Sequence, residues 1–117
     1  MGHRGKLLKS LFGKGQVKIG KVGQSLPDFS NVRVDRKTVF GNPKSVMEVG
    51  RTEACEYYEK YADNCMREAG AYQKAMNKLR IRLARGENIL LQCHCVDVYT
   101  GKGKRCHAQT IMRILLR

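Results

Sequence analysis

The chain has 117 residues, of which 23 are Lys or Arg and 10 are Asp or Glu, so its formal net charge is +13. This length suits one domain with one modest core, and a hydrophobic content of 42% argues against a disordered chain. No apolar run approaches the ~18 residues of a membrane span, and no signal-peptide core follows Met1. We therefore expect a cytoplasmic protein with no membrane partner.

The N-terminal segment is rich in Gly and Lys, and the first acidic residue of the chain is Asp28. We predict that residues 1–15 form a flexible basic arm ahead of a single α/β domain over residues 16–117. Lys and Arg on such an arm suit phosphate contacts, because each neutralised phosphate releases counterions without requiring a fixed shape. The predicted contacts on the arm are Arg4, Lys6 and Lys9.

Two short strands are predicted in the first third of the chain. Polar and apolar residues alternate over residues 16–22, with Val17 and Ile19 on one face, which is the pattern of a half-buried strand. Residues 32–34 form a second strand candidate, and turn-forming residues occupy positions 26–31 between the two.

The segment Phe40-Gly41-Asn42-Pro43 predicts a sharp loop. Gly41 can adopt a positive φ, and Pro43 disfavours the helical region at Asn42. We predict that Gly41, Asn42 and Pro43 form a loop whose free backbone N–H groups face a ligand.

A first helix is predicted to begin at Arg51-Thr52, with Thr52 as its N-cap. Residues that recur at three- and four-residue steps predict a buried stripe made by Ala54, Tyr57, Tyr58, Tyr61 and Cys65. The helix also carries half of the acids of the chain, so it should face away from nucleic acid; these acids are Glu53, Glu56, Glu59, Asp63 and Glu68.

A second helix is predicted between Gly70 and Gly86, with Gly86 as its C-terminal stop. Its apolar stripe is Tyr72, Ala75, Met76, Leu79 and Leu83. Its opposite face carries only cations and no acid four residues away from any of them, which predicts a phosphate-facing ridge made by Lys74, Lys78, Arg82 and Arg85.

The last third contains a continuous apolar run over residues 88–92, as expected of a central strand covered on both faces. It ends in Cys93-His94-Cys95, and after a Gly- and Lys-rich loop a last helix begins at Cys106 or His107. The predicted order of strand, strand, helix, helix, strand, helix indicates a small α/β domain with a short sheet and about three helices. Ligands bind beyond the carboxyl ends of strands in such sheets, which makes this Cys/His block the candidate functional centre.

Anion binding is one interpretation of the block. The cations Lys102, Lys104 and Arg105 come just before the N-terminus of the last helix, where free N–H groups and the helix dipole attract phosphate.

Metal binding is a second interpretation, because Cys93, Cys95, Cys106 and His107 offer three sulfurs and an imidazole, a set that suits zinc. Two features argue against it. The C-x-C spacing is tighter than usual, and adjacent helical residues such as Cys106 and His107 project about 100° apart. His94 could take the place of His107 as the imidazole ligand, but it should leave the strand on the face opposite Cys93 and Cys95.

Catalysis is a third interpretation. Cys106 at a helix N-terminus, preceded by Arg105, should have a lowered pKa and act as a nucleophile, with His107 or His94 as base.

The residues Val32-Arg33-Val34-Asp35-Arg36, the GNP tripeptide, the C-x-C pair and Cys106-His107-Ala108 together resemble a domain-of-unknown-function family of bacteriophages and bacteria. The resemblance runs from about Gln16 to the C-terminus. That family is similar to Rossmann-like nucleotide-binding domains, which implies a three-layer α/β fold, nucleotide recognition and, for a phage protein, the host cytoplasm. The loop between Cys95 and Cys106 is longer and more basic than the family's usual link, and the basic arm is extra.

The leading hypothesis is therefore a phage-type small basic protein that binds nucleic acid or a nucleotide. Two alternatives stay open at this point. One is a cysteine-dependent, nucleotide-processing enzyme centred on Cys106, and the other is a zinc-stabilised interaction module that acts on a host protein.

Overall fold

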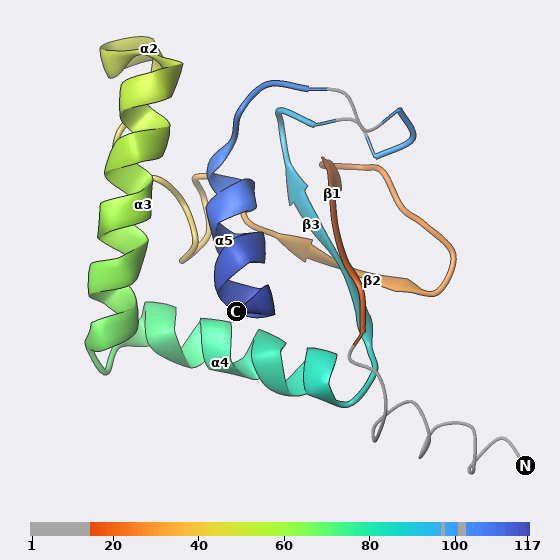
Figure 1. The fold of residues 1–117 in the computed structure, drawn as a ribbon. Coiled ribbons are helices and arrows are strands. Elements are labelled where there is room, and N and C mark those ends of the chain that lie inside the picture. Colours follow the sequence, from red (N-terminus) through yellow and green to blue (C-terminus); the bar gives the residue numbers. More distant parts are fainter. Residues whose placement is uncertain (1–14, 97, 101–102) are drawn as a thin grey trace, which may run out of the picture.

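A three-stranded parallel sheet lies at the centre of the structure, a computed structural model that describes residues 15–96, 98–100 and 103–117 (Figure 1). The strands are β1 (Val17–Lys21), β2 (Phe29–Arg33) and β3 (Asn88–Cys93), in the order β1-β3-β2. The predicted basic arm, with Arg4, Lys6 and Lys9, lies outside the described residues, and so does Lys102.

Strand β3 is the middle strand, as its apolar sequence predicts. Ile89, Leu90 and Leu91 are all fully buried. Ile89 pairs with Val17 of β1 on one side and with Ser30 of β2 on the other. Because all three strands run parallel, their carboxyl ends meet at one edge of the sheet.

The described residues form four helices: α2 (Val46–Val49), α3 (Arg51–Arg67), α4 (Ala71–Ala84) and α5 (His107–Leu116). Figure 1 shows α3, α4 and α5 together on one side of the sheet. Buried residues from each of these three helices, such as Tyr58, Met76 and Ile111, share one core cluster with Ile89, Leu91 and Cys93. None of the described helices is long and apolar enough to cross a membrane.

The other face of the sheet is covered by loops. The Gln92 side chain donates a hydrogen bond to the carbonyl of Gln24 over 2.7 Å, and the Gln24 side chain accepts one from the Val98 N–H over 2.9 Å. The predicted small α/β class is confirmed. The predicted Rossmann-like three-layer arrangement is not, because within the described ranges no helix covers this second face.

Several predicted elements need correction. Strand β2 begins at Phe29, inside the predicted turn, because parallel pairing with β3 holds this half-exposed segment extended. Gly50, with φ 85°, is the N-cap of α3, and Thr52 lies one position inside the helix. Tyr57 is 36% exposed, so it does not belong to the buried stripe, and Cys55 is buried in its place.

Helix α2 was not predicted. Its one turn is held by the Ser45 hydroxyl, which accepts a hydrogen bond from the Met47 N–H. Helix α4 matches its prediction, with Tyr72, Met76, Leu79 and Leu83 buried. Gly86 follows α4 with φ 89°, as expected of a helix-ending glycine.

Candidate functional site

A pocket of about 150 Å³ lies beyond the carboxyl ends of β2 and β3. Its walls come from the segment after β2, the start of α2, the N-terminal part of α3, the end of β3 with the bend after it, and the start of α5 with the residue before it. The Cys93-to-His107 block, which the sequence singles out, lies at this strand-to-helix junction and lines the pocket.

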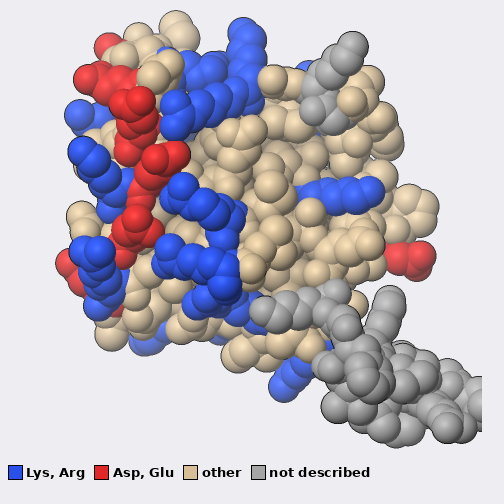
Figure 2. Space-filling view, viewed as in Figure 1, with Lys and Arg blue, Asp and Glu red and all other residues tan. Residues whose placement is uncertain are grey.

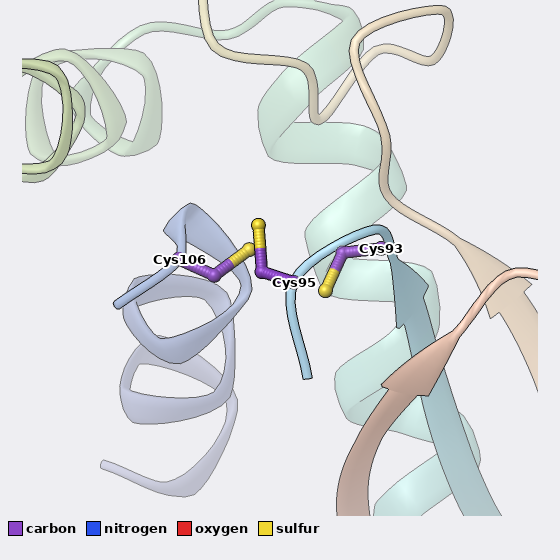
Figure 3. A group of neighbouring side chains, drawn as sticks. All are labelled: Cys93, Cys95 and Cys106. Atoms are coloured by element: carbon purple, nitrogen blue, oxygen red, sulfur yellow. The ribbon is translucent and has the colours of Figure 1, made fainter. Parts of the chain in front are cut away.

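Three cysteines converge in the wall of this pocket (Figure 3). The sulfur atoms of Cys93, Cys95 and Cys106 all lie within 4.8 Å of one another. Cys93 ends β3, Cys95 lies in the bend that follows, and Cys106 is the N-cap of α5. A bridge between Val96 and Gly103 folds the intervening loop back on itself, so the chain returns Cys106 to the end of the strand.

The His107 imidazole lies beside this group of sulfurs. Its Nδ1 atom lies 3.6 Å from the Cys106 sulfur, and its Nε2 atom contacts the Val34 carbonyl oxygen. Since a carbonyl only accepts hydrogen bonds, this contact requires a proton on Nε2, and in the neutral ring the lone pair is then on Nδ1. The expected 100° divergence does not apply, because Cys106 has extended backbone angles and precedes the helix.

The sulfurs of Cys93 and Cys106 share a hydrogen bond that moves their pKa values apart. The hydrogen bond from Cys106 lowers the pKa of Cys93 to about 6, against the opposing effect of burial, with help from the N–H groups of Cys95 and Val96. The same hydrogen bond and burial raise the pKa of Cys106 far above its usual range. The prediction of a low pKa at Cys106 is therefore wrong, because this thiol is buried and donates its proton to Cys93.

Asp35 is a pocket residue that was not among the predicted site residues. It lies just after β2, with Val34 between it and the end of the strand, is 4% exposed and lines the pocket. Its Oδ2 atom accepts a hydrogen bond from Arg33 and lies 3.5 Å from His94 Nε2, while Oδ1 has no partner among the described residues. The hydrogen bond from Arg33 lowers the pKa of Asp35 more than burial raises it. An acid placed just after a strand of a parallel sheet is the signal that could have found it.

The prediction that strand alternation turns the His94 side chain away from Cys93 and Cys95 does not apply. The strand ends at Cys93, so strand alternation no longer sets the direction of the next side chain. The His94 side chain is 69% exposed and lines the pocket together with Cys93 and Cys95.

Four cationic side chains line the pocket: Arg36, Lys44, Arg51 and Arg105. Arg51 donates hydrogen bonds to the Cys95 sulfur over 3.4 Å and to the Arg105 carbonyl over 2.9 Å. Arg105 pairs with Glu59 over 3.1 Å, and the Lys44 ammonium lies 4.6 Å from the centre of the Tyr57 ring. Only Arg105 was predicted, because the other three come from segments far from the Cys/His block in sequence.

The GNP loop contributes to the pocket through the side chain of Asn42. Asn42 lines the pocket, but its amide donates to the Ala54 carbonyl over 2.8 Å and its oxygen accepts from the Lys44 N–H over 3.0 Å. The Gly41 N–H is bonded to the Thr38 carbonyl. Of the predicted loop, Gly41 and Pro43 do not line the pocket, so the expected row of free N–H groups is not found among these residues.

The predicted ridge on α4 lies at the other end of the molecule (Figure 1). Arg80 of this helix contacts the carbonyl of Arg117, at the C-terminal end of α5, whereas the pocket lies at the N-terminal end of α5. Arg82 pairs with Glu87, so the ridge is not free of acidic partners, in contrast to the prediction. Lys74, Lys78 and Arg85 are exposed.

The acids of α3 form a stripe on the surface, with Lys and Arg on both sides of it (Figure 2). Two of these acids pair with cations that flank α5: Glu59 with Arg105 before the helix, and Asp63 with Arg117 after it. Lys104, another predicted phosphate contact, is exposed and does not line the pocket.

Comparison with known proteins gives one match. A family described as a domain of unknown function, DUF4326, matches residues 17–117. No curated protein and no solved structure matches the chain. The match covers the sheet, the helices and every residue of the pocket. The chain therefore belongs to the DUF4326 family of domains of unknown function.

Proposed function

We propose that the protein binds a phosphate-bearing ligand, a nucleotide or a nucleic acid, with a phosphate group in the pocket at the carboxyl edge of the sheet. The observation that carries this proposal is the charge of the lining: four Lys and Arg side chains against two acidic groups, the Asp35 carboxyl and the Cys93 thiol, whose pKa is lowered. Asp35 already pairs with Arg33, so it offsets little of the positive charge. A cytoplasmic location is part of the proposal, since thiols stay reduced there.

Arg36 is the residue best suited to meet the ligand. It follows Asp35 in the segment after β2, is exposed, and makes no ion pair with any residue that the structure describes. A guanidinium without a partner can give two parallel hydrogen bonds to one phosphate. Lys44, on the loop after Asn42, adds a second cation to the same pocket.

The size of the pocket limits what enters it. Pockets that enclose a whole small molecule commonly have ~300–1,000 Å³, whereas this one has about 150 Å³. A phosphate or pyrophosphate group fits such a volume better than a complete nucleotide. We expect the sugar and base to lie outside the pocket, which is compatible with a free nucleotide and with a nucleic-acid end.

A metal centre is a second candidate role for the site. The specific observation is the cluster of three sulfurs within 4.8 Å, which could hold a zinc ion. A nucleophile at Cys106 is not proposed, because the pKa of this thiol is raised.

Calorimetric titration of the full chain tests the main proposal. The probes are inorganic phosphate, pyrophosphate, adenosine mono- and triphosphate, and a single-stranded oligonucleotide with and without a 5′ phosphate. We expect binding that strengthens with the number of phosphates and weakens steeply with salt. Binding by adenosine alone, or binding that is indifferent to salt, would contradict the proposal.

A further inference from the structure

Three thiol sulfurs lie close enough to one another to share a thiophilic metal. The sulfurs of Cys93, Cys95 and Cys106 are within 4.8 Å of one another, and a tetrahedral zinc with Zn–S bonds of about 2.3 Å requires roughly 3.8 Å between sulfurs. The difference is within the reach of cysteine rotamer changes. Cys55 and Cys65, the other two cysteines, do not belong to this cluster.

His107 supplies an imidazole in the orientation of a metal ligand. Its Nδ1 lies 3.6 Å from the Cys106 sulfur, close to the roughly 3.5 Å between a sulfur and a nitrogen on one tetrahedral zinc. Its Nε2 faces the Val34 carbonyl, and metal-bound histidines commonly donate their second N–H to such a group. His107 is not within 4.8 Å of all three sulfurs, so a metal would draw the Cys93 and Cys95 side chains toward it.

The surrounding charge also suits a metal–thiolate group. Three thiolates, one neutral imidazole and one Zn²⁺ carry a net charge of −1. The Arg51 guanidinium already donates a hydrogen bond to the Cys95 sulfur over 3.4 Å, so it compensates this charge directly.

We infer that Cys93, Cys95, Cys106 and His107 together form a four-ligand zinc site, with His107 Nδ1 as the fourth ligand. This deepens the metal candidate above, on which it rests, and is independent of phosphate binding. A metal held this way joins the end of β3 to the start of α5, and the Val34 contact of His107 brings in the segment after β2. The bound metal would therefore hold in place the wall of the pocket that is formed at the ends of β2 and β3.

Metal content of the full chain gives the first test. Protein purified without chelator is expected to carry about one zinc per chain, and so is Cys65→Ser, the matched control outside the cluster. Cys93→Ser, Cys95→Ser and Cys106→Ser should each lose it. Chelator should lower the unfolding temperature of the wild type and of Cys65→Ser, a readout that does not require the cluster variants to fold.

Cobalt substitution tests the fourth ligand. The wild-type Co²⁺ spectrum should show thiolate charge transfer and the bands of a tetrahedral site. His107→Gln keeps a donor for Val34 and should weaken zinc by at least the ~10–100-fold that follows loss of a ligand's hydrogen-bond partner. His107→Cys should restore tight binding. An unchanged affinity and spectrum in His107→Gln would overturn His107 as ligand, whereas absence of metal and of a cobalt spectrum in the wild type would overturn the whole site.

Discussion

Asp35 holds a buried carboxylate between Arg33 and His94, at the edge of the pocket. Its lowered pKa, caused first by the Arg33 hydrogen bond, links this residue to stability. A carboxyl whose folded pKa is below its unfolded value of about 3.8 stabilises the fold above that value. The contribution is lost as the pH falls through the folded pKa.

Substitution of this pair should therefore depend on pH. At pH 7 we expect Asp35→Asn to lower the free energy of unfolding by about 1–2 kcal/mol, since a charge-assisted hydrogen bond is lost. Arg33→Gln should cost more, because it leaves a buried carboxylate without its cation. Both differences should shrink as the pH falls below about 3.8 and through the lower pKa of the folded carboxyl, where Asp35 gains a proton. Urea unfolding at pH 7 and at acid pH measures this, and a cost for Asp35→Asn that grows toward low pH would contradict it.

Tyr58 ties three segments together in the core. Its buried hydroxyl donates to the Phe40 carbonyl over 2.7 Å and shares a hydrogen bond with the Tyr72 hydroxyl over 2.8 Å. Burial raises the pKa of Tyr72 to about 12 and that of Tyr58 further, so both stay neutral at physiological pH.

Tyr58→Phe should cost about 1–3 kcal/mol of stability, because it leaves the Phe40 carbonyl and the Tyr72 hydroxyl without a buried partner. Tyr72→Phe is the matched control, since it breaks one hydrogen bond and leaves the Tyr58 hydroxyl free to donate to Phe40. Thermal and urea unfolding should both give the larger loss for Tyr58→Phe. The reverse order would show that the Phe40 contact does not carry the stabilisation.

Apart from Asn42 of the GNP loop, the residues of the site were predicted only where they are close in sequence. Cys93, Cys95, Cys106 and His107 were found because one strand and one helix bring them together. Asp35, Arg36 and Arg51 were missed because their approach depends on the order and register of the strands. The pKa of Cys106 was predicted with the wrong sign because the partner sulfur of Cys93 was not known to lie beside it.

At the scale of elements, strong patterns were predicted and weak ones were not. The continuous apolar run gave β3 and its central place, and the stripes gave α4 and α5. Polar and apolar residues alternate poorly along strand β2, and none of its residues is fully buried. Only its pairing with β3 therefore defines this strand. The one-turn helix α2 depends on a single cap, Ser45, and is too short to show a period.

The GNP loop depends on one close approach of backbone to backbone. A Cβ at Gly41 would lie 2.6 Å from the Arg36 carbonyl oxygen, a distance that the chain must relieve by moving. Because Arg36 and Asn42 both line the pocket, such movement should reach the site.

Gly41→Ala should therefore lower both the unfolding temperature and the affinity for pyrophosphate. Gly70→Ala is the matched control, because a Cβ at Gly70 meets nothing within 4 Å and its φ of −143° is open to any residue. Differential scanning calorimetry and titration compare the two variants. Equal, small effects of both substitutions would show that the loop can shift without consequence for the pocket.

At the scale of the whole molecule, the net charge of +13 is divided between separate surfaces. The pocket gathers cations at the carboxyl edge of the sheet, while the α4 ridge lies at the opposite end (Figure 1). The acidic stripe of α3 runs between neighbouring basic areas on the face shown in Figure 2. A general positive field would attract phosphate to all of these surfaces, whereas a built site would act at one of them.

The most direct test of the account compares two double variants that remove the same charge. Arg36→Gln/Lys44→Gln acts in the pocket, and Lys74→Gln/Lys78→Gln acts on exposed positions of α4. Pyrophosphate affinity at physiological salt should fall by about 10- to 100-fold in the pocket variant, as expected for the loss of hydrogen bonds to a charged group. It should change little in the α4 variant, and equal losses in both would contradict a phosphate site in the pocket.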